Sequence, residues 1–93
     1  MKRRSRTDNT QAAIVAALRV RGWTVADTHE LGRGFPDLVI SRSGRVLLIE
    51  VKDGAKKASA RTLTAAEALV HMGFRLAGVP VVIVESVEDV VSL

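Results

Sequence analysis

The segment from residue 45 to residue 52, RVLLIEVK, constrains the fold of this chain more than any other. Successive side chains of a β-strand point to opposite faces, so apolar residues at both odd and even positions give a strand with two buried faces. Such a strand must lie inside a sheet that is covered on both sides. Its polar exceptions, Glu50 and Lys52, share one face at the C-terminal end. A buried carboxylate there is costly unless it is paired or binds a metal ion.

The segments around this strand predict an α/β fold with the element order αβββαβ. Apolar residues at helical spacing predict a first helix over residues 8–21, and a Thr-x-x-Glu capping box predicts a second over residues 64–73. Strands are predicted at 23–26, 37–41, 45–52 and 79–85, loops at 27–35 and 53–62, and a short last helix from residue 86. The sum is a four-stranded mixed sheet flanked by helices.

Composition limits the classes of protein to which the chain can belong. Its 93 residues predict a single domain over 1–93, with residues 1–7 as a basic, flexible N-terminus. The absence of cysteine excludes disulfides, thiolate zinc sites and cysteine nucleophiles. No signal peptide or apolar stretch of about 20 residues is present, so a cytoplasmic protein without a membrane partner is expected. A net charge of +4 suits a partner with phosphates, although many soluble domains are equally basic.

The start of the second predicted strand adds another carboxylate, because Asp37 follows Pro36 at the edge of an apolar run. If Asp37 lies beside Glu50, both carboxylates and the backbone carbonyl of Val51 become candidate metal ligands. Mg²⁺ prefers such oxygen ligands, and a bound cation neutralises phosphoryl oxygens and lowers the pKa of bound water. Lys52 would stabilise the pentavalent phosphate or orient the attacking water. The pattern predicts a phosphodiester hydrolase that uses Mg²⁺, with Mn²⁺ as a substitute.

Four segments, in this order, resemble the VRR-NUC family of the PD-(D/E)XK nuclease superfamily, in particular its small stand-alone phage and prophage members. They are Asp8-Asn9-Thr10-Gln11, Gly32-Arg33-Gly34-Phe35-Pro36-Asp37-Leu38, Leu48-Ile49-Glu50-Val51-Lys52-Asp53-Gly54, and Leu63-Thr64-Ala65-Ala66-Glu67 with His71. The similarity spans residues 7–93. One position departs from the family pattern, because Glu67 stands where the family usually has glutamine.

The resemblance implies a restriction-endonuclease-like fold and a structure-selective DNA endonuclease that acts on four-way (Holliday) junctions. It supports Asp37, Glu50 and Lys52 as catalytic residues and adds Gln11 and Glu67 from the two helices. Symmetric incision of a four-way junction by so small a subunit implies a homodimer. No small-molecule cofactor is expected, and a phage-encoded member would act in a bacterial host cell.

Basic and polar side chains near the proposed site are the expected nucleic-acid contacts, namely Arg33, Lys56, Lys57, Arg61 and His71. Each assignment has a structural alternative. Glu50 and Lys52 can form an ion pair, Asp37 can initiate a turn, and Asp8 and Glu67 can cap helices. The alternative function is a catalytically silent nucleic-acid-binding or assembly module on the same fold, and an RNA substrate also stays open.

Overall fold

The computed structural model describes residues 6–93, with side chains from residue 9 onward, and its elements follow the predicted αβββαβ order. The helices are α1 (Arg6–Val20), α2 (Ala65–Leu76) and α3 (Val87–Val90). The strands are β1 (Thr24–Asp27), β2 (Leu38–Arg42), β3 (Arg45–Val51) and β4 (Val81–Val84). Two short 3₁₀ helices, η1 (His29–Leu31) and η2 (Ala58–Arg61), lie within segments predicted to be loops.

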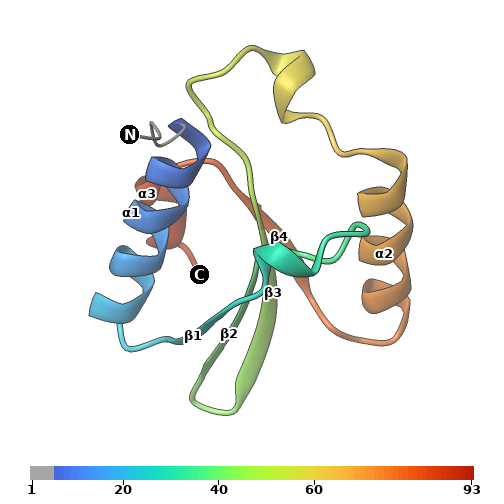
Figure 1. Ribbon diagram of the computed structural model, residues 1–93. Coiled ribbons are helices and arrows are strands. Elements are labelled where there is room, and N and C mark those ends of the chain that lie inside the picture. The colour runs from blue at the N-terminus through green and yellow to red at the C-terminus, as the bar shows by residue number, and fades with distance from the viewer. Residues whose placement is uncertain (1–5) are drawn as a thin grey trace.

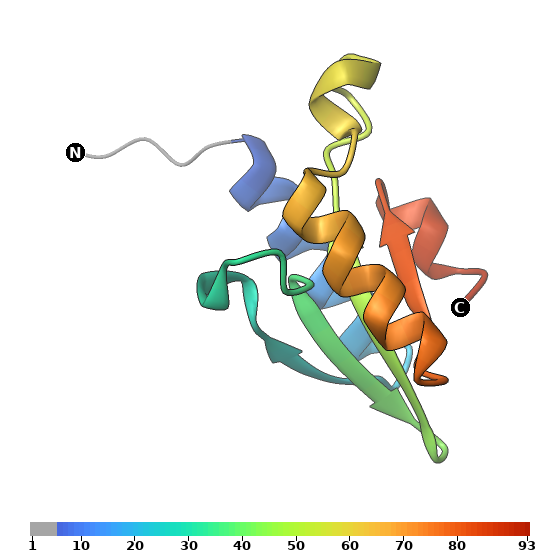
Figure 2. The ribbon, with the colours of Figure 1, turned by 90° about the vertical axis from the view of Figure 1, so that its right-hand side faces the viewer.

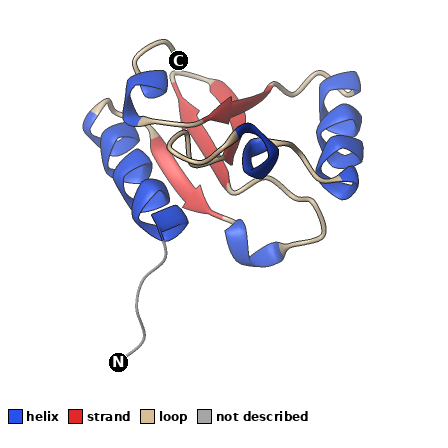
Figure 3. Cartoon of the chain, turned by 90° about the horizontal axis from the view of Figure 1, so that it is seen from above, coloured by secondary structure: helices blue, strands red, loops and turns tan. Residues whose placement is uncertain are grey.

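The four strands form one mixed sheet in the order β1-β2-β3-β4. The first three strands pair antiparallel, and β4 runs parallel to β3. Helices α1 and α3 cover one face of the sheet and α2 lies across the other (Figures 1 and 3). Figure 2, which looks onto α2, shows this helix crossing in front of the strands. The three layers confirm the predicted α/β class.

The apolar core lies between the sheet and the α1/α3 layer. Strand β3 sends alternate side chains into it, and the neighbouring strands and both helices complete it. Its buried members are Ile14, Leu18, Trp23, Leu38, Ile40, Leu47, Ile49, Val51, Val84 and Val90. The other parity of β3 turns Leu48 and Glu50 toward α2. The predicted burial of both faces of this strand is therefore confirmed from Leu47 to Val51.

The ends of the helices differ from their predicted positions. Helix α1 begins at Arg6 rather than at residue 8, so Asp8 lies inside the helix and its interpretation as an N-cap is wrong. Residues 6 and 7, predicted to be flexible, are helical, while residues 1–5 and the side chain of Asp8 lie outside the description. Helix α2 continues past Gly73 to Leu76 because a single glycine weakens a helix without ending it.

Strands β1 and β2 have the predicted lengths but begin one residue later, and β3 and β4 are shorter than predicted. Asp37 comes just before β2, and Lys52 comes just after β3. Pro80 precedes the edge strand β4, where its missing N–H costs no ladder hydrogen bond, and its carbonyl accepts the N–H of Leu48 at 3.0 Å. Among residues 6–93, no helix combines the length and the hydropathy that a bilayer crossing requires.

Candidate active site

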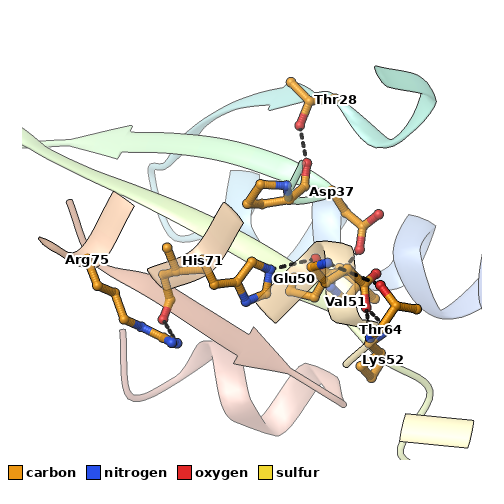
Figure 4. A network of polar contacts seen from close by, with 11 residues as sticks. Thr28, Asp37, Glu50, Val51, Lys52, Thr64, His71 and Arg75 are labelled. Atoms are coloured by element: carbon orange, nitrogen blue, oxygen red, sulfur yellow. Dashed lines mark hydrogen bonds and ion pairs between the residues drawn. The ribbon is translucent and has the colours of Figure 1, made fainter. Parts of the chain in front are cut away.

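Two carboxylates from adjoining strands meet at the C-terminal end of β3. Leu38 pairs with Ile49, and one further step of this register sets Asp37 opposite Glu50 on the α2 face of the sheet. The Oδ2 atom of Asp37 also accepts the backbone N–H of Val51 at 2.8 Å (Figure 4). Strand pairing and this hydrogen bond therefore hold both acids at one edge of the sheet.

Glu50 is a buried acid, with a relative exposure of 3%. Burial raises the pKa of its carboxyl, a hydrogen bond to Asp37 and the charges of Asp37 and Glu67 raise it further, and Lys52 opposes them. The resulting pKa is about 9, so this carboxyl holds a proton at neutral pH. A bound cation would lower the pKa of Glu50, because its positive charge would stabilise two ionised carboxylates side by side.

His71 supports Glu50 from α2. Its Nε2 lies 3.0 Å from Oε1 of Glu50, and the residue has 0% exposure (Figure 4). Burial lowers the pKa of this imidazole, with the charge of Arg75 in the same direction. Its buried Nδ1 has no partner among the described residues, which also favours the neutral ring. The predicted direct contact of His71 with nucleic acid is therefore corrected, since a fully buried ring orients Glu50 instead.

Lys52 and Glu67 form an ion pair beside the two acids, with Nζ and Oε1 3.0 Å apart. The same Oε1 accepts the backbone N–H of Thr64 at 2.9 Å, and the N–H of Glu67 donates to Oγ1 of Thr64 at 3.1 Å. The predicted capping box is thus confirmed. Burial raises the pKa of Glu67, but Thr64 and Lys52 together bring it below its usual value. Glu67 is accordingly an ionised carboxylate that caps α2 and holds Lys52 at once.

The loop before Asp37 fixes α2 against the site. A Cβ on Gly34 would lie 2.5 Å from the carbonyl oxygen of Ala66, and the φ of Gly34 is +85°. Only glycine fits this contact with the first turn of α2. Phe35 adds an edge-to-face contact with Phe74, with ring centroids 5.7 Å apart. The loop therefore sets the position of the helix that carries Glu67 and His71.

Gln11, which the resemblance adds to the site, contacts the carboxylate of Asp27. Its Nε2 donates to both carboxylate oxygens of Asp27, at 3.2 and 3.3 Å. Oδ1 of Asp27 also accepts Nδ1 of His29 at 2.9 Å. The sequence analysis did not single out Asp27 or His29. Their i, i+2 spacing at the end of β1 is a weak signal, since it becomes informative only once α1 is known to lie alongside.

The predicted phosphate contacts lie in two loops near this edge of the sheet. Arg33, Lys56 and Lys57 are exposed. Arg61 is held by Glu85, with Nη1 and Oε2 3.2 Å apart, and both side chains are about one-third exposed, at 31% and 36%. Its guanidinium thus links the segment between β3 and α2, which arches over the sheet edge in Figure 1, to the end of β4.

The donors suit a magnesium ion that keeps most of its water. Among the described side chains, no group of three or more His, Asp and Glu residues is arranged to hold a metal ion. Asp37, Glu50 and the carbonyl of Val51 provide a smaller oxygen set. The N–H of Val51 points to Asp37, and in an antiparallel ladder the carbonyl of the same residue points the same way. Two carboxylates and a carbonyl fit Mg²⁺, which typically retains several waters.

Comparisons with known proteins give one informative match. No family profile and no curated protein matches the sequence. A solved structure described as "VRR_NUC domain" matches with a TM-score of 0.74 and 26% identity, and the alignment covers 97% of this chain and 95% of that chain. The fold is therefore the restriction-endonuclease-like α/β fold, which is a nuclease fold. Within that class, the match supports the VRR-NUC family and confirms the resemblance seen in the sequence motifs.

Proposed function

We propose that this chain is a metal-dependent endonuclease that hydrolyses phosphodiester bonds in DNA. The observation that carries the proposal is the convergence of Asp37, Glu50 and Lys52 at one edge of the sheet. A buried acid beside a second carboxylate destabilises a fold, and a cation that binds both of them gives a functional reason to keep them. The ion pair of Lys52 with Glu67 supplies an amine next to these acids.

Each residue has a separable task in this proposal. Asp37, Glu50 and the carbonyl of Val51 would hold Mg²⁺, or Mn²⁺ in its place. When bound, the ion supplies Lewis-acid stabilisation of the negative charge that develops on the phosphate. Lys52 places a positive charge against a non-bridging oxygen. His71 fixes the orientation of Glu50 through a 3.0 Å contact.

The direct test is nicking of labelled synthetic four-way junctions, flaps and linear duplexes with Mg²⁺ or Mn²⁺. Glu50→Gln keeps the size of the side chain and removes its ability to ionise when a cation binds, and Glu88→Gln on the exposed side of α3 is the matched control. The proposal predicts cleavage by the wild type and the control and none by Glu50→Gln. Cleavage that persists in Glu50→Gln would point to a contaminant. Binding without cleavage of any DNA or RNA would favour the silent module.

A homodimer that acts on branched DNA is the expected assembly. Helix α2 exposes Leu69, Met72 and Leu76, with relative exposures of 69%, 52% and 81%. Their spacing places them along one side of the helix, away from buried His71. A second copy of this chain related by a two-fold axis would cover this stripe and supply the second cut. Light scattering of the wild type and of Leu69→Glu tests this, and a monomeric wild type that still cuts junctions symmetrically would contradict it.

A further inference from the structure

A second polar cluster lies on the α1 side of the sheet, outside the set of Asp37, Glu50 and Lys52. It consists of Gln11 on α1, Asp27 at the end of β1, and His29 on η1. Asp27 accepts Nδ1 of His29 at 2.9 Å and its backbone N–H at 3.1 Å, in addition to the amide of Gln11. In Figure 2, η1 and the N-terminal half of α1 lie on the same side of the molecule. Asp27 is therefore fixed by three donors, and it fixes the imidazole in turn.

The arrangement leaves the other ring nitrogen of His29 outward. Nδ1 contacts Asp27, and no contact of Nε2 occurs among the described residues. The side chain is 46% exposed. His29 and Asp27 border two grooves of about 520 and 410 Å³, the larger of which is also lined by Gln11, Ala12, Val15, Ala16 and Arg19. A ligand can therefore reach Nε2, while the carboxylate behind Nδ1 holds the ring in one orientation.

The surroundings of His29 keep the ring protonated to a higher pH than usual. The hydrogen bond to Asp27 raises the pKa of the imidazole, burial lowers it by less, and the charges of Asp27, Glu30 and Asp37 raise it further. On the α1 side, neutral Gln11 and cationic Arg19 line the groove. The carboxylates outnumber the single cation, so the imidazole keeps its proton to a higher pH than an unperturbed histidine does.

The cluster is tied to the candidate active site through Thr28. The N–H of Thr28 donates to the carbonyl oxygen of Asp37 at 2.8 Å, and its Oγ1 donates to the carbonyl oxygen of Pro36 at 2.8 Å. His29 is the next residue in the chain, and the charge of Asp37 reaches its ring. The backbone just before His29 is therefore fixed next to the backbone of Asp37 by short hydrogen bonds.

We propose that His29 is the general acid that protonates the leaving oxygen during phosphodiester hydrolysis, with Asp27 and Gln11 as positioning residues. This inference depends on the proposed nuclease function. As water adds to phosphorus, the bond from phosphorus to the leaving oxygen breaks, and that oxygen takes the proton from Nε2 of His29. The proton of the water passes to solvent, and solvent reprotonates the imidazole. One hydroxyl end and one phosphate end result.

The other described groups near the site are less suited to this task. The Nζ atom of Lys52 is held by Oε1 of Glu67 at 3.0 Å. His71 is fully buried and contacts Glu50. His29 is the exposed imidazole of the described chain, and a group that titrates near the working pH is the more effective proton donor.

The test replaces the leaving oxygen of a cleavable DNA substrate with sulfur, which departs without being protonated. Single-turnover rates with Mn²⁺ are compared for the wild type, His29→Gln and the matched surface control Glu88→Gln on α3, on the oxygen substrate and on 3′-sulfur and 5′-sulfur versions of the same oligonucleotide. We expect His29→Gln to lose about 10²–10⁴-fold on the oxygen substrate and to come within about threefold of the wild type on one sulfur substrate. Asp27→Asn should show a smaller loss with the same rescue.

Two further readouts separate this role from a structural one. The oxygen-substrate rate of the wild type should fall at high pH as His29 loses its proton, and that fall should be absent in His29→Gln. Melting temperature and Mn²⁺ affinity should be unchanged. An equal loss on oxygen and sulfur, or no loss on either, would overturn the general-acid role while wild-type cleavage keeps the nuclease proposal intact. A wild type that cleaves nothing overturns both.

Discussion

Ile49 and Glu50 are neighbours on β3, yet they face environments with opposite demands. Ile49 has 0% exposure within an apolar cluster built by the sheet, α1 and α3. Glu50 points to the other face, where it meets Asp37 and His71. The apolar cluster includes no described residue of α2. One face of the sheet therefore supplies stability, and the other holds the polar groups to which we assign binding and catalysis in the proposed function.

Helix α2, which covers the face with the proposed site, is joined to the rest of the chain by specific contacts. The Lys52–Glu67 pair, the Glu50–His71 contact and the docking of Gly34 onto Ala66 join α2 to the rest of the chain. Polar pairs in such a position specify a geometry more than they add net stability. The comparison of the two faces thus predicts that substitutions on them will separate activity from stability.

The largest expected effect is on turnover in Lys52→Ala. Lys52 shares a face with Glu50 and carries the amine nearest to the acids. If it stabilises the phosphate during hydrolysis, the single-turnover rate should fall about 10²–10⁴-fold while DNA affinity changes little. Cleavage assays and fluorescence anisotropy on the same junction measure the two quantities. Lys57→Ala, in the exposed loop, is the matched charge control.

A loss of binding in Lys52→Ala as large as the loss of turnover would remove the contrast between the two faces. It would show that Lys52 serves as a general phosphate contact, like the exposed lysines, rather than as part of the catalytic group.

Ile49→Ala should have the largest effect on folding. Removing three carbons from a side chain with 0% exposure should lower the free energy of unfolding by about 2–5 kcal/mol, through lost burial and the cavity that remains. Urea titration followed by circular dichroism measures it. The Ile49→Ala protein that stays folded should bind Mn²⁺ normally, because the apolar face does not contact the acids. A change below about 0.5 kcal/mol would mean that this face is not the main source of stability.

Glu50→Gln, unlike Ile49→Ala, should raise the free energy of unfolding in metal-free buffer. The folded protein holds the proton of Glu50 up to a pKa of about 9, against an ordinary value of 4.5. Between those two pH values folding takes up a proton, so the free energy of unfolding of the wild type falls as pH rises. Glutamine removes that slope, and we expect about 1–3 kcal/mol of added stability near pH 7.5.

Thermal or urea unfolding of both proteins with EDTA from pH 5 to pH 9 measures this difference. The other titratable groups contribute equally to the pH dependence of both proteins, so their contributions cancel. The two curves should lie closest at pH 5 and separate toward pH 9. Parallel curves would mean that Glu50 ionises normally in the folded protein, and that the α2 face imposes no penalty.

The alternation of residues along the strands predicted which side chains lie on each face of the sheet. The packing of the helices against the sheet could not be predicted in the same way. A period of two along residues 45–52 fixes which side chains share a face, so the position of Glu50 opposite Asp37 followed from two short strands. Helical spacing placed His71 on the same side as Glu67 but not its depth, because burial depends on how closely α2 packs. The partner of Gln11 was not predictable for the same reason, since Asp27 becomes its partner through the packing of α1.

The smallest expected effect belongs to Glu67→Gln, which restores the residue usual in the family that this chain resembles. Oε1 of Glu67 accepts both Thr64 and Lys52, and a glutamine carbonyl oxygen can accept the same two hydrogen bonds. The substitution removes only a negative charge. Stability should change by less than about 1 kcal/mol, and activity should stay level or rise because Lys52 loses a competing counter-ion. A collapse of activity in a folded variant would show that the site uses Glu67 as a third carboxylate.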